Sequence, residues 1–284
     1  MSNFKYIKKI AESYPYEHYE RPPICKVELW DFSRVNECEE ARIEAVTTVA
    51  SISYGNEYAR NPEKLYELLI ERGHESPFEF VWGIVDFSSK LTNLRREDFK
   101  YTEESTAVRN YKLDIATFKL KVPIFVARQI MRHRTFSYME MSRRHTKHEK
   151  QPVICWRPPK FVDNPQWSPC PNLWVYDHLK PEQARAYQPL AIYTIFWMQG
   201  NYKAWSNFFI YRLASETQEE TRLIAQAMWN LLKRHQPEII ETIGEYLDEW
   251  IEDCNPIFIP ARRKRAEWFR ENFLIEERAC NSKK

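Results

Sequence analysis

The chain has 284 residues, of which 43% are hydrophobic, and its 42 Lys and Arg residues nearly balance its 40 Asp and Glu residues. This length and composition predict a globular protein with an ample core, built as one large domain or two smaller ones. A net charge of +2 is too small for a protein that binds nucleic acid through a general excess of positive charge, so no nucleic-acid partner is expected.

Membrane proteins and metalloproteins are two further classes that the sequence does not favour. There is no run of about eighteen apolar residues that would span a membrane, and no apolar core of a signal peptide follows Met1. The six cysteines are scattered without the paired spacing of a zinc or redox site. We therefore expect a cytoplasmic protein with free thiols, no membrane partner and no bound metal.

Hydrophobic periodicity predicts one strand and two helices in the N-terminal part. Residues 1–30 are rich in Tyr and Pro and are expected to be mostly irregular, with a short strand at residues 27–30. Apolar residues recur at helical spacing in residues 36–53 and in residues 61–73, which open with an Asn-Pro pair and close with a glycine. Residues 73–80 then predict a connection from helix to strand.

Two predicted strands flank a charged insertion in the middle of the chain. Residues 81–88 and, more strongly, residues 116–122 alternate between apolar and polar side chains. The charged residues 89–114 between them are expected to form a surface excursion. A helix is predicted for residues 124–134, with Pro123 in its first turn.

The C-terminal half is predicted to be mainly helical. Residues 145–180 are rich in Pro and Trp, and such a long segment is typical of a functional loop or a cover. Helices are predicted at residues 181–200 with a break at Pro189, at 201–212, from a capping box at 217–220 to Pro237, and at 239–252. The basic run at residues 261–265 is interpreted as a solvated helix face.

Residues 127–144 concentrate the chemistry of the chain, because they contain five arginines and a histidine. On the predicted helix Arg128 and Arg132 share one face, and residues 135–138 predict a turn that carries Glu140 and Ser142. Arginine cannot lose its proton, so clustered guanidinium groups repel one another unless an anion lies among them. This pattern favours a site for a phosphorylated or other anionic small molecule. A solvated basic helix face remains an alternative explanation.

The same stretch resembles the signature of the flavin-dependent thymidylate synthases. That signature is Arg132-His133-Arg134, then seven residues, then Ser142. The flanking Arg128-Gln129 and three more blocks are similar as well, at residues 73–80, 184–189 and 201–212.

The resemblance implies an α+β fold with an antiparallel sheet and packed helices. It covers about residues 35–240, which are expected to form the catalytic domain, with insertions at 89–114 and 146–180. Residues 1–34 are expected to be an N-terminal extension and residues 241–284 a C-terminal helical extension. The family also implies a homotetramer whose active sites lie at subunit interfaces.

The resemblance further implies the reaction. It is the reductive methylation of dUMP at C5 to dTMP, with methylenetetrahydrofolate as the carbon donor and reduced FAD, regenerated by NADPH, as the hydride source. The pyrimidine nucleotide and the folate would be the partners of the protein. Arg212 matches the arginine that promotes ionisation of the uracil ring, so it is the expected catalytic residue.

The remaining site residues are carried over by position. His74 is expected to lie near the flavin. The residues expected to bind FAD are Ser76, Arg132, His133, Arg134, Glu140, Asn201, Lys203 and Asn207. Those expected to bind dUMP are Gln129, Arg132, Glu140, Met141, Ser142, Arg143, Arg144, Arg185 and Arg212.

Several residues depart from the family pattern: Met139, His145, Lys203 and Glu216 replace Asn, Tyr, Arg and His. These positions touch flavin or nucleotide, so a related C5 methyl or hydroxymethyl transfer onto another pyrimidine nucleotide is an alternative. A non-catalytic relative that binds nucleotide or flavin is a second one. Cys170, between two prolines, is similar to the cysteine nucleophile of the other thymidylate synthase class, but the rest of that class's pattern is absent.

Overall fold

An antiparallel sheet lies at the centre of the computed structural model, which describes residues 4–15, 25–35, 37–81, 115–144, 153–158 and 173–274. In these residues the sheet has five strands in the order β1-β2-β3-β5-β4. The strands are β1 (Lys8–Ser13), β2 (Lys26–Asp31), β3 (Ile115–Pro123), β4 (Ser137–Glu140) and β5 (Tyr193–Asn201). The longest pairing joins β3 to β5 along their full length, from Ile115 opposite Asn201 to Pro123 opposite Tyr193.

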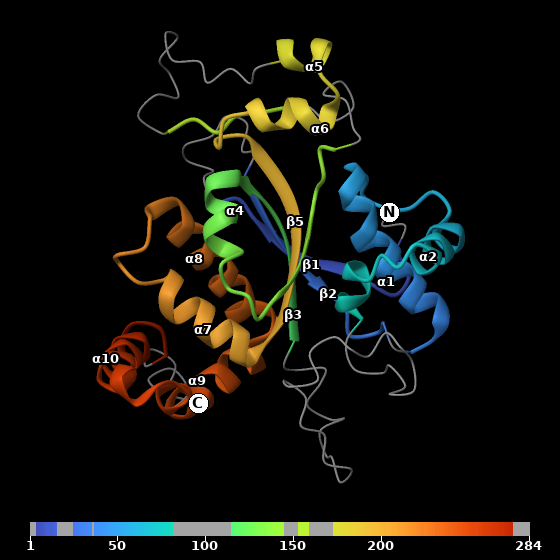
Figure 1. Cartoon of the computed structure of the whole chain (residues 1–284). Helices are drawn as coiled ribbons and strands as arrows, with labels where there is room; N and C mark the ends of the chain where they lie inside the picture. The colour runs from blue at the N-terminus through green and yellow to red at the C-terminus, as the bar shows by residue number, and fades with distance from the viewer. Residues whose placement is uncertain are drawn as a thin grey trace.

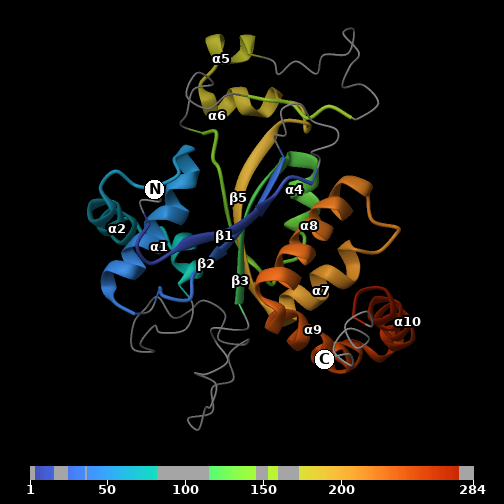
Figure 2. The same ribbon diagram turned by 180° about the vertical axis from the view of Figure 1, so that it is seen from behind.

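Helices cover both faces of the sheet, as Figures 1 and 2 show. One face carries α1 (Glu39–Ser51), η1 (Ile52–Tyr54), α2 (Pro62–Glu71) and the 3-10 turn η2 (Ser76–Phe80). The other face carries α4 (Ile124–Ile130), α7 (Tyr202–Arg212), α8 (Glu219–His235), α9 (Pro237–Glu252), η7 (Pro256–Phe258), α10 (Ile259–Phe269) and η8 (Arg270–Leu274). At one end of the sheet lie α5 (Trp174–His178), α6 (Pro181–Ala184) and η6 (Arg185–Tyr187). The predicted α+β fold with an antiparallel sheet is confirmed.

The two faces of the sheet bury two separate hydrophobic cores. Alternation along β3 sends Phe118 into the larger core, where it packs against Trp205 of α7. On the opposite face Trp197 of β5 contacts Trp30 of β2 at a ring separation of 5.1 Å. Full burial of one such ring contributes about 2–3 kcal/mol. The sheet is therefore held from both sides, and the larger core lies under the helices that carry the candidate site.

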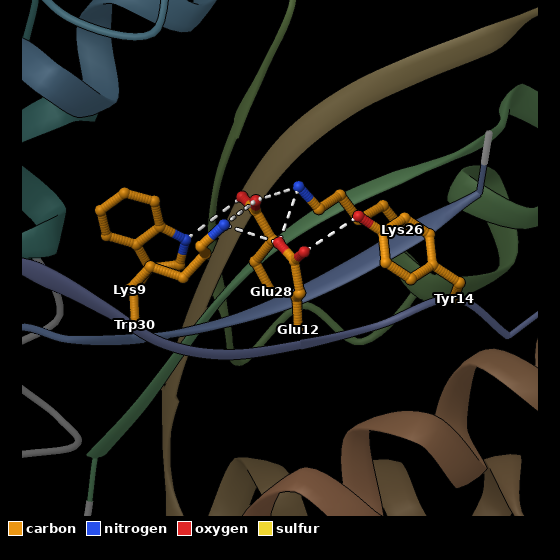
Figure 3. A network of polar contacts seen from close by, with 6 residues as sticks. All are labelled: Lys9, Glu12, Tyr14, Lys26, Glu28 and Trp30. Atoms are coloured by element: carbon orange, nitrogen blue, oxygen red, sulfur yellow. Dashed lines mark hydrogen bonds and ion pairs between the residues drawn. The ribbon is translucent and has the colours of Figure 1, made fainter. Parts of the chain in front are cut away.

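A network of ion pairs ties the edge strand β1 to β2. The Lys26 ammonium contacts Glu12 at 2.8 Å and Glu28 at 2.7 Å. Hydrogen bonds from Lys26 and then Lys9 lower the pKa of the Glu12 carboxyl to about 2. Figure 3 shows the six side chains that take part: Lys9, Glu12, Tyr14, Lys26, Glu28 and Trp30.

Local signals in the sequence account for two well-defined helix starts. Asn61 accepts a hydrogen bond from the Lys64 N–H and precedes Pro62, the first residue of α2. Gly73, with a φ of 64°, follows that helix in the left-handed conformation that glycine adopts most easily. Asn201 caps α7 in the same way, by accepting from the Ala204 N–H at 3.0 Å.

Most of the predicted elements are confirmed. The strand at residues 27–30 corresponds to β2, and the strand at residues 116–122 corresponds to β3. The helices predicted near α1, α2, α7, α8 and α9 are all present.

The largest error concerns residues 181–200, which were expected to be helical with a break at Pro189. From Tyr193 onward they form β5, an inner strand of the sheet. Helical structure stops at Tyr187, before Pro189. The residues that follow include Tyr193, Thr194, Ile195, Phe196 and Trp197, and β-branched and aromatic side chains favour a strand buried on both faces.

The region of the signature also differs from the prediction. The helix expected at residues 124–134 ends at Ile130, so Arg132 is not on it, and Pro123 is the last residue of β3. The expected turn at residues 135–138 runs into β4 instead, because Ser137 to Glu140 pair with β5. The irregular N-terminal segment likewise contains a strand, β1.

Two smaller expectations need correction. The predicted capping box is absent, because the Thr217 hydroxyl donates to Tyr211 O and Gln218 is the N-cap of α8. The basic run at residues 261–265 is not wholly solvated, because Arg262 donates to Trp250 O and Asp253 O.

Some expectations fall outside the described residues. They are residues 82–88 of a predicted strand, the insertion at 89–114, His145, most of residues 146–180, Cys170 and Cys280. Among the described residues Cys25, Cys38, Cys155 and Cys254 are not joined in disulfides, as expected. Among the described residues no helix has the length and apolar character needed to cross a membrane.

Gly200 provides a test of how tightly β5 packs. A Cβ atom at this position would lie 2.5 Å from the ring of Phe136, whereas a Cβ at Gly244 of α9 would make only an ordinary 3.5 Å contact with Leu274. We predict that Gly200→Ala lowers the free energy of unfolding by about 1–3 kcal/mol. The matched Gly244→Ala should leave stability unchanged or raise it by up to about 1 kcal/mol. Urea unfolding measures both, and equal stability of the two variants would contradict the packing described.

Candidate functional site

A pocket of about 500 Å³ lies where the end of α4, the turn after it, the C-terminal half of α7 and the start of α8 meet. This volume is in the range of small-molecule sites. The residues that line it are Gln129, Arg132, His133, Arg134, Thr135, Asn207, Tyr211, Arg212, Glu216, Thr217, Gln218 and Arg265.

The turn that carries the three signature residues is fixed from two directions. The Tyr138 hydroxyl lies 3.0 Å from Ile130 O and 2.9 Å from His133 O, so it closes the turn from β4. The neighbouring Phe136 ring is buried and packs edge-on against Trp205 of α7, with a ring separation of 4.6 Å. The turn is therefore attached to the larger core, which gives its side chains a fixed origin.

Arg212 and His133 form the central contact of the pocket. The Arg212 Nε–H donates to His133 Nε2 at 2.8 Å, and Nη2 donates to Gln129 O at 2.8 Å. Two hydrogen bonds therefore fix the plane of the guanidinium group, and no other described residue is seen to accept from its remaining N–H groups, which a ligand can contact.

Burial decides the charge state of this pair. His133 is 8% exposed, and burial, followed by the positive charge of Arg212, lowers the pKa of its imidazole to about 4. Burial, followed by the charge of Arg132, also lowers the pKa of Arg212, but a guanidinium keeps its proton at neutral pH. A neutral histidine thus accepts a hydrogen bond from a charged arginine.

Amide side chains connect this pair to the surrounding helices. The Asn207 amide nitrogen lies 3.4 Å from His133 Nδ1, and its oxygen lies 3.5 Å from the indole nitrogen of Trp250 in α9. The Gln129 side chain donates to Gln218 and accepts from the Thr221 hydroxyl at the start of α8. These contacts hold α4, α7, α8 and α9 in one arrangement around the pocket.

The pocket carries an excess of positive charge. Among the described residues that line it, four are arginines, Arg132, Arg134, Arg212 and Arg265, and one carries a carboxylate, Glu216. Because His133 is neutral at pH 7, it adds nothing to this charge. Guanidinium groups that converge on one cavity suit an anionic ligand, and groups of this kind could hold the charged parts of a flavin or a nucleotide.

The structure brings together six of the site residues predicted from the sequence: Gln129, Arg132, His133, Arg134, Asn207 and Arg212. Four of them come from α4 and the turn directly after it, and the other two come from α7, about seventy residues later in the sequence. Arg132 and Arg134 are exposed at the rim of the pocket, whereas His133 between them is buried.

A second group of predicted residues lies along and beyond β4, at the edge of the sheet. Glu140 accepts a hydrogen bond from the Thr194 hydroxyl at 2.7 Å, and Ser142 is bound through its N–H to Ser53 O. Arg143 is buried and donates to Tyr193 O at 3.3 Å. Met139 and Met141 pack against the smaller core, and Arg144 is exposed.

The remaining predicted residues are scattered over other surfaces. His74 and Ser76 are exposed just before and at the start of η2, which packs on the smaller core, on the opposite face of the sheet from the pocket. Arg185 is exposed at the start of η6. At the N-terminus of α7, Asn201 caps the helix, and Lys203 pairs with Glu249 at 3.2 Å. The roles assigned to these residues stay predictions.

Sequence reasoning missed five pocket residues: Thr135, Tyr211, Thr217, Gln218 and Arg265. Gln218 lies two residues after Glu216, a position already compared with the family pattern, so a signal for it existed. Tyr211 lies next to Arg212 on α7, but nothing in the sequence distinguished it from a surface tyrosine. No signal pointed to Arg265, because only the packing of α10 against α7 brings it to the pocket.

Comparison with known proteins identifies the family that the chain resembles. Residues 113–238 match the family model described as thymidylate synthase complementing protein. The flavin-dependent thymidylate synthase of Pseudothermotoga lettingae is 28% identical over 216 residues, which cover 69% of this chain and 83% of that protein. That of Thermosipho africanus is 28% identical over 230 residues, 71% of this chain and 86% of the other.

The resemblance to the flavin-dependent thymidylate synthases is confirmed. A more distant relative of the same name, from Synechocystis sp., is 25% identical over 213 residues, with 67% of this chain and 84% of that protein covered. The segment matched by the thymidylate synthase family model contains every residue that lines the pocket except Arg265.

The buried histidine makes stability depend on pH. Because the folded-state pKa of His133 is about 4 and the ordinary value is 6.5, the unfolded chain takes up this proton first as the pH falls. The part of the free energy of unfolding that depends on a neutral His133 is fully present above about pH 6.5. It declines as the pH falls toward about 4 and below, and its complete loss amounts to about 3 kcal/mol.

We predict that the stability difference between the wild type and His133→Gln shrinks by about 2.5 kcal/mol, most of this amount, when urea unfolding is repeated at about pH 4.5 instead of about pH 7.5. The glutamine keeps an acceptor for Arg212 but cannot titrate. The exposed His235 of α8, changed to Gln, is the control. A difference between wild type and His133→Gln that does not change with pH would contradict the neutral buried histidine.

Proposed function

We propose that this protein is a flavin-dependent thymidylate synthase. In this proposal it transfers a methylene group from methylenetetrahydrofolate to C5 of dUMP and reduces it to methyl, with FAD as the bound cofactor and NADPH as the reductant. Support comes from the family resemblance and from one observation above all. That observation is the guanidinium group of Arg212, held by two hydrogen bonds in a pocket of positive charge.

The proposed reaction needs a fixed positive charge. For C5 of uracil to attack an electrophilic carbon without a cysteine nucleophile, electron density must build up on the ring. A guanidinium group that is already oriented stabilises this charge without reorganising during the reaction. Partial burial of Arg212 reduces screening by water and strengthens the effect.

His133 has a positioning role in this account. As a neutral acceptor it orients Arg212 and adds no second positive charge beside it. A protonated His133 would have no lone pair on Nε2 for the Arg212 Nε–H, and the two cations would repel each other. The account therefore requires the low pKa that burial gives to this histidine.

The residues of the pocket suit the proposed ligands. Arg134 and Asn207 would contact the flavin, and Arg132 and Gln129 would contact the nucleotide, through charged and amide hydrogen bonds. When bound, the flavin would supply the hydride chemistry, for which no protein side chain is a substitute. The chain's own contribution is to bind, orient and keep water away from the reacting groups.

The distribution of the other predicted residues supports an assembly in which sites form between subunits. A cavity of about 500 Å³ has room for one or two ring systems and not for a whole FAD with nucleotide and folate. Ser76 and His74 lie on the opposite face of the sheet, and Arg144 and Arg185 are exposed away from the pocket. In the proposed homotetramer a neighbouring subunit would bring such residues to the pocket.

One observation favours a second candidate function. Glu216 lines the pocket at a position where the related enzymes usually have histidine, and it adds a negative charge there. A carboxylate can accept a hydrogen bond from a ring N–H or an amino group, which the pyrimidine bases carry in different patterns. The alternative is therefore the same type of C5 transfer onto a different pyrimidine nucleotide.

The proposal predicts that Arg212→Ala lowers the rate of dTMP formation by at least about a hundredfold, because the developing charge loses its fixed partner. The assay supplies dUMP, methylenetetrahydrofolate, FAD and NADPH and measures dTMP. Arg234→Ala removes the same charge from the exposed end of α8 and should retain wild-type activity. Wild-type protein that forms no dTMP would overturn the proposal, and an active Arg212→Ala variant would overturn the role of Arg212.

A further inference from the structure

Helix α10 places an arginine in the pocket from outside the segment that the family model matches. That segment ends at residue 238, whereas Arg265 lies on α10 (Ile259–Phe269). Arg265 lines the same cavity as Arg132, Arg134 and Arg212. The pocket therefore contains a charge that the matched segment of the family does not supply.

The position of Arg265 is set by the packing of its helix. Residues three or four apart share a helix face, so Arg262, Arg265, Ala266 and Phe269 lie on one side of α10. Phe269 is fully buried and packs edge-on against Trp229 of α8 at a ring separation of 5.3 Å. Arg262 lies over the ring of Trp250 in α9. With its neighbours anchored in this way, Arg265 cannot swing away with the helix.

The two inward-facing arginines of α10 differ in their partners. Arg262 donates to the backbone oxygens Trp250 O and Asp253 O, so its bonds fasten α10 to the end of α9. Arg265 instead lies 4.9 Å above the ring of Tyr211 and pairs with the Glu216 carboxylate. Tyr211 and Glu216 line the pocket as well, so all three side chains form one wall of it.

The ion pair between Arg265 and Glu216 is weak enough for an anionic group of a ligand to replace the carboxylate. The Glu216 side chain is 59% exposed, and an ion pair with so exposed a partner is weak because water competes for both charges. An anionic group that enters a pocket with four guanidinium groups would compete with Glu216 for Arg265. Stacking on Tyr211 would keep the guanidinium in place during that exchange.

We propose that Arg265 binds an anionic group of the ligand in this pocket, and that Glu216 is the internal counter-ion with which this group competes. The inference rests on the proposed function for the identity of the ligand, a pyrimidine nucleotide. If Arg265 binds the ligand, the site extends to α10, and it includes a binding residue that lies outside residues 113–238, the segment matched by the family model.

The two members of the pair should respond in opposite directions, which separates this role from a structural ion pair. In the flavin-loaded protein, Arg265→Gln should weaken dUMP binding by about tenfold, the loss expected for a hydrogen bond to a charged group. Glu216→Gln should strengthen it by up to about fivefold, because the competing charge is gone. Arg265→Lys, which keeps the charge, should retain part of the affinity.

Calorimetric titration with dUMP measures these affinities, with Arg263→Gln as the matched control. Arg263 is exposed on the outer face of the same helix, so its variant removes the same charge and should bind dUMP as the wild type does. Melting temperatures of all variants are measured in parallel, and unchanged values are expected for Arg265→Gln and Glu216→Gln.

Two results would overturn the inference. One is an Arg265→Gln variant that binds dUMP as tightly as Arg263→Gln. The other is a joint loss of affinity and melting temperature in both Arg265→Gln and Glu216→Gln, which is the behaviour of a structural pair. Failure of the proposed function is distinguishable from both, because the wild-type protein itself would then bind no dUMP.

Discussion

The hydrogen bond from Arg212 to His133 is the interaction on which the rest of the candidate site depends. It joins the last residue of α7 to the turn after α4, two parts of the chain that are far apart in sequence. It requires His133 to be neutral, and burial against α7 provides this by lowering the pKa to about 4. The histidine ring in turn packs edge-on against Phe208, so the charge state of the site is a consequence of the aromatic core beneath it.

The sheet gives this arrangement its rigidity. Strand β5 pairs with β3 on one side and β4 on the other, and it runs directly into α7 through the Asn201 cap. At Gly200 the absence of a side chain lets the Phe136 ring approach the strand closely, and that ring carries the signature turn. Backbone pairing, one glycine and one buried phenylalanine thus connect the core to the pocket. A site built on such elements keeps its geometry better than one built on loops.

The sequence predicted the chemistry of the site better than its geometry. Apolar residues at helical spacing, with a start signal at Asn61-Pro62, placed α1, α2, α8 and α9, and α7 lies in the block at residues 201–212. The strand β5 was missed because a strand buried on both faces has no alternation that distinguishes it from a buried helix. Arg132, His133 and Arg212 were identified from motifs, but only tertiary packing showed that His133 is buried and accepts from Arg212. Arg265 was beyond prediction, since its helix carries no motif and reaches the pocket by folding back on α7.

The central claim is that one pocket binds both a flavin and a pyrimidine nucleotide beside Arg212. The most direct test is the visible absorbance spectrum of the purified protein, loaded with FAD and titrated with dUMP. The account predicts flavin bands that shift on adding dUMP, because the nucleotide would enter the same site and change the surroundings of the flavin ring. A protein that stays colourless after incubation with FAD would contradict the account. Flavin bands that respond to a different pyrimidine nucleotide and not to dUMP would contradict the assignment of dUMP as the substrate.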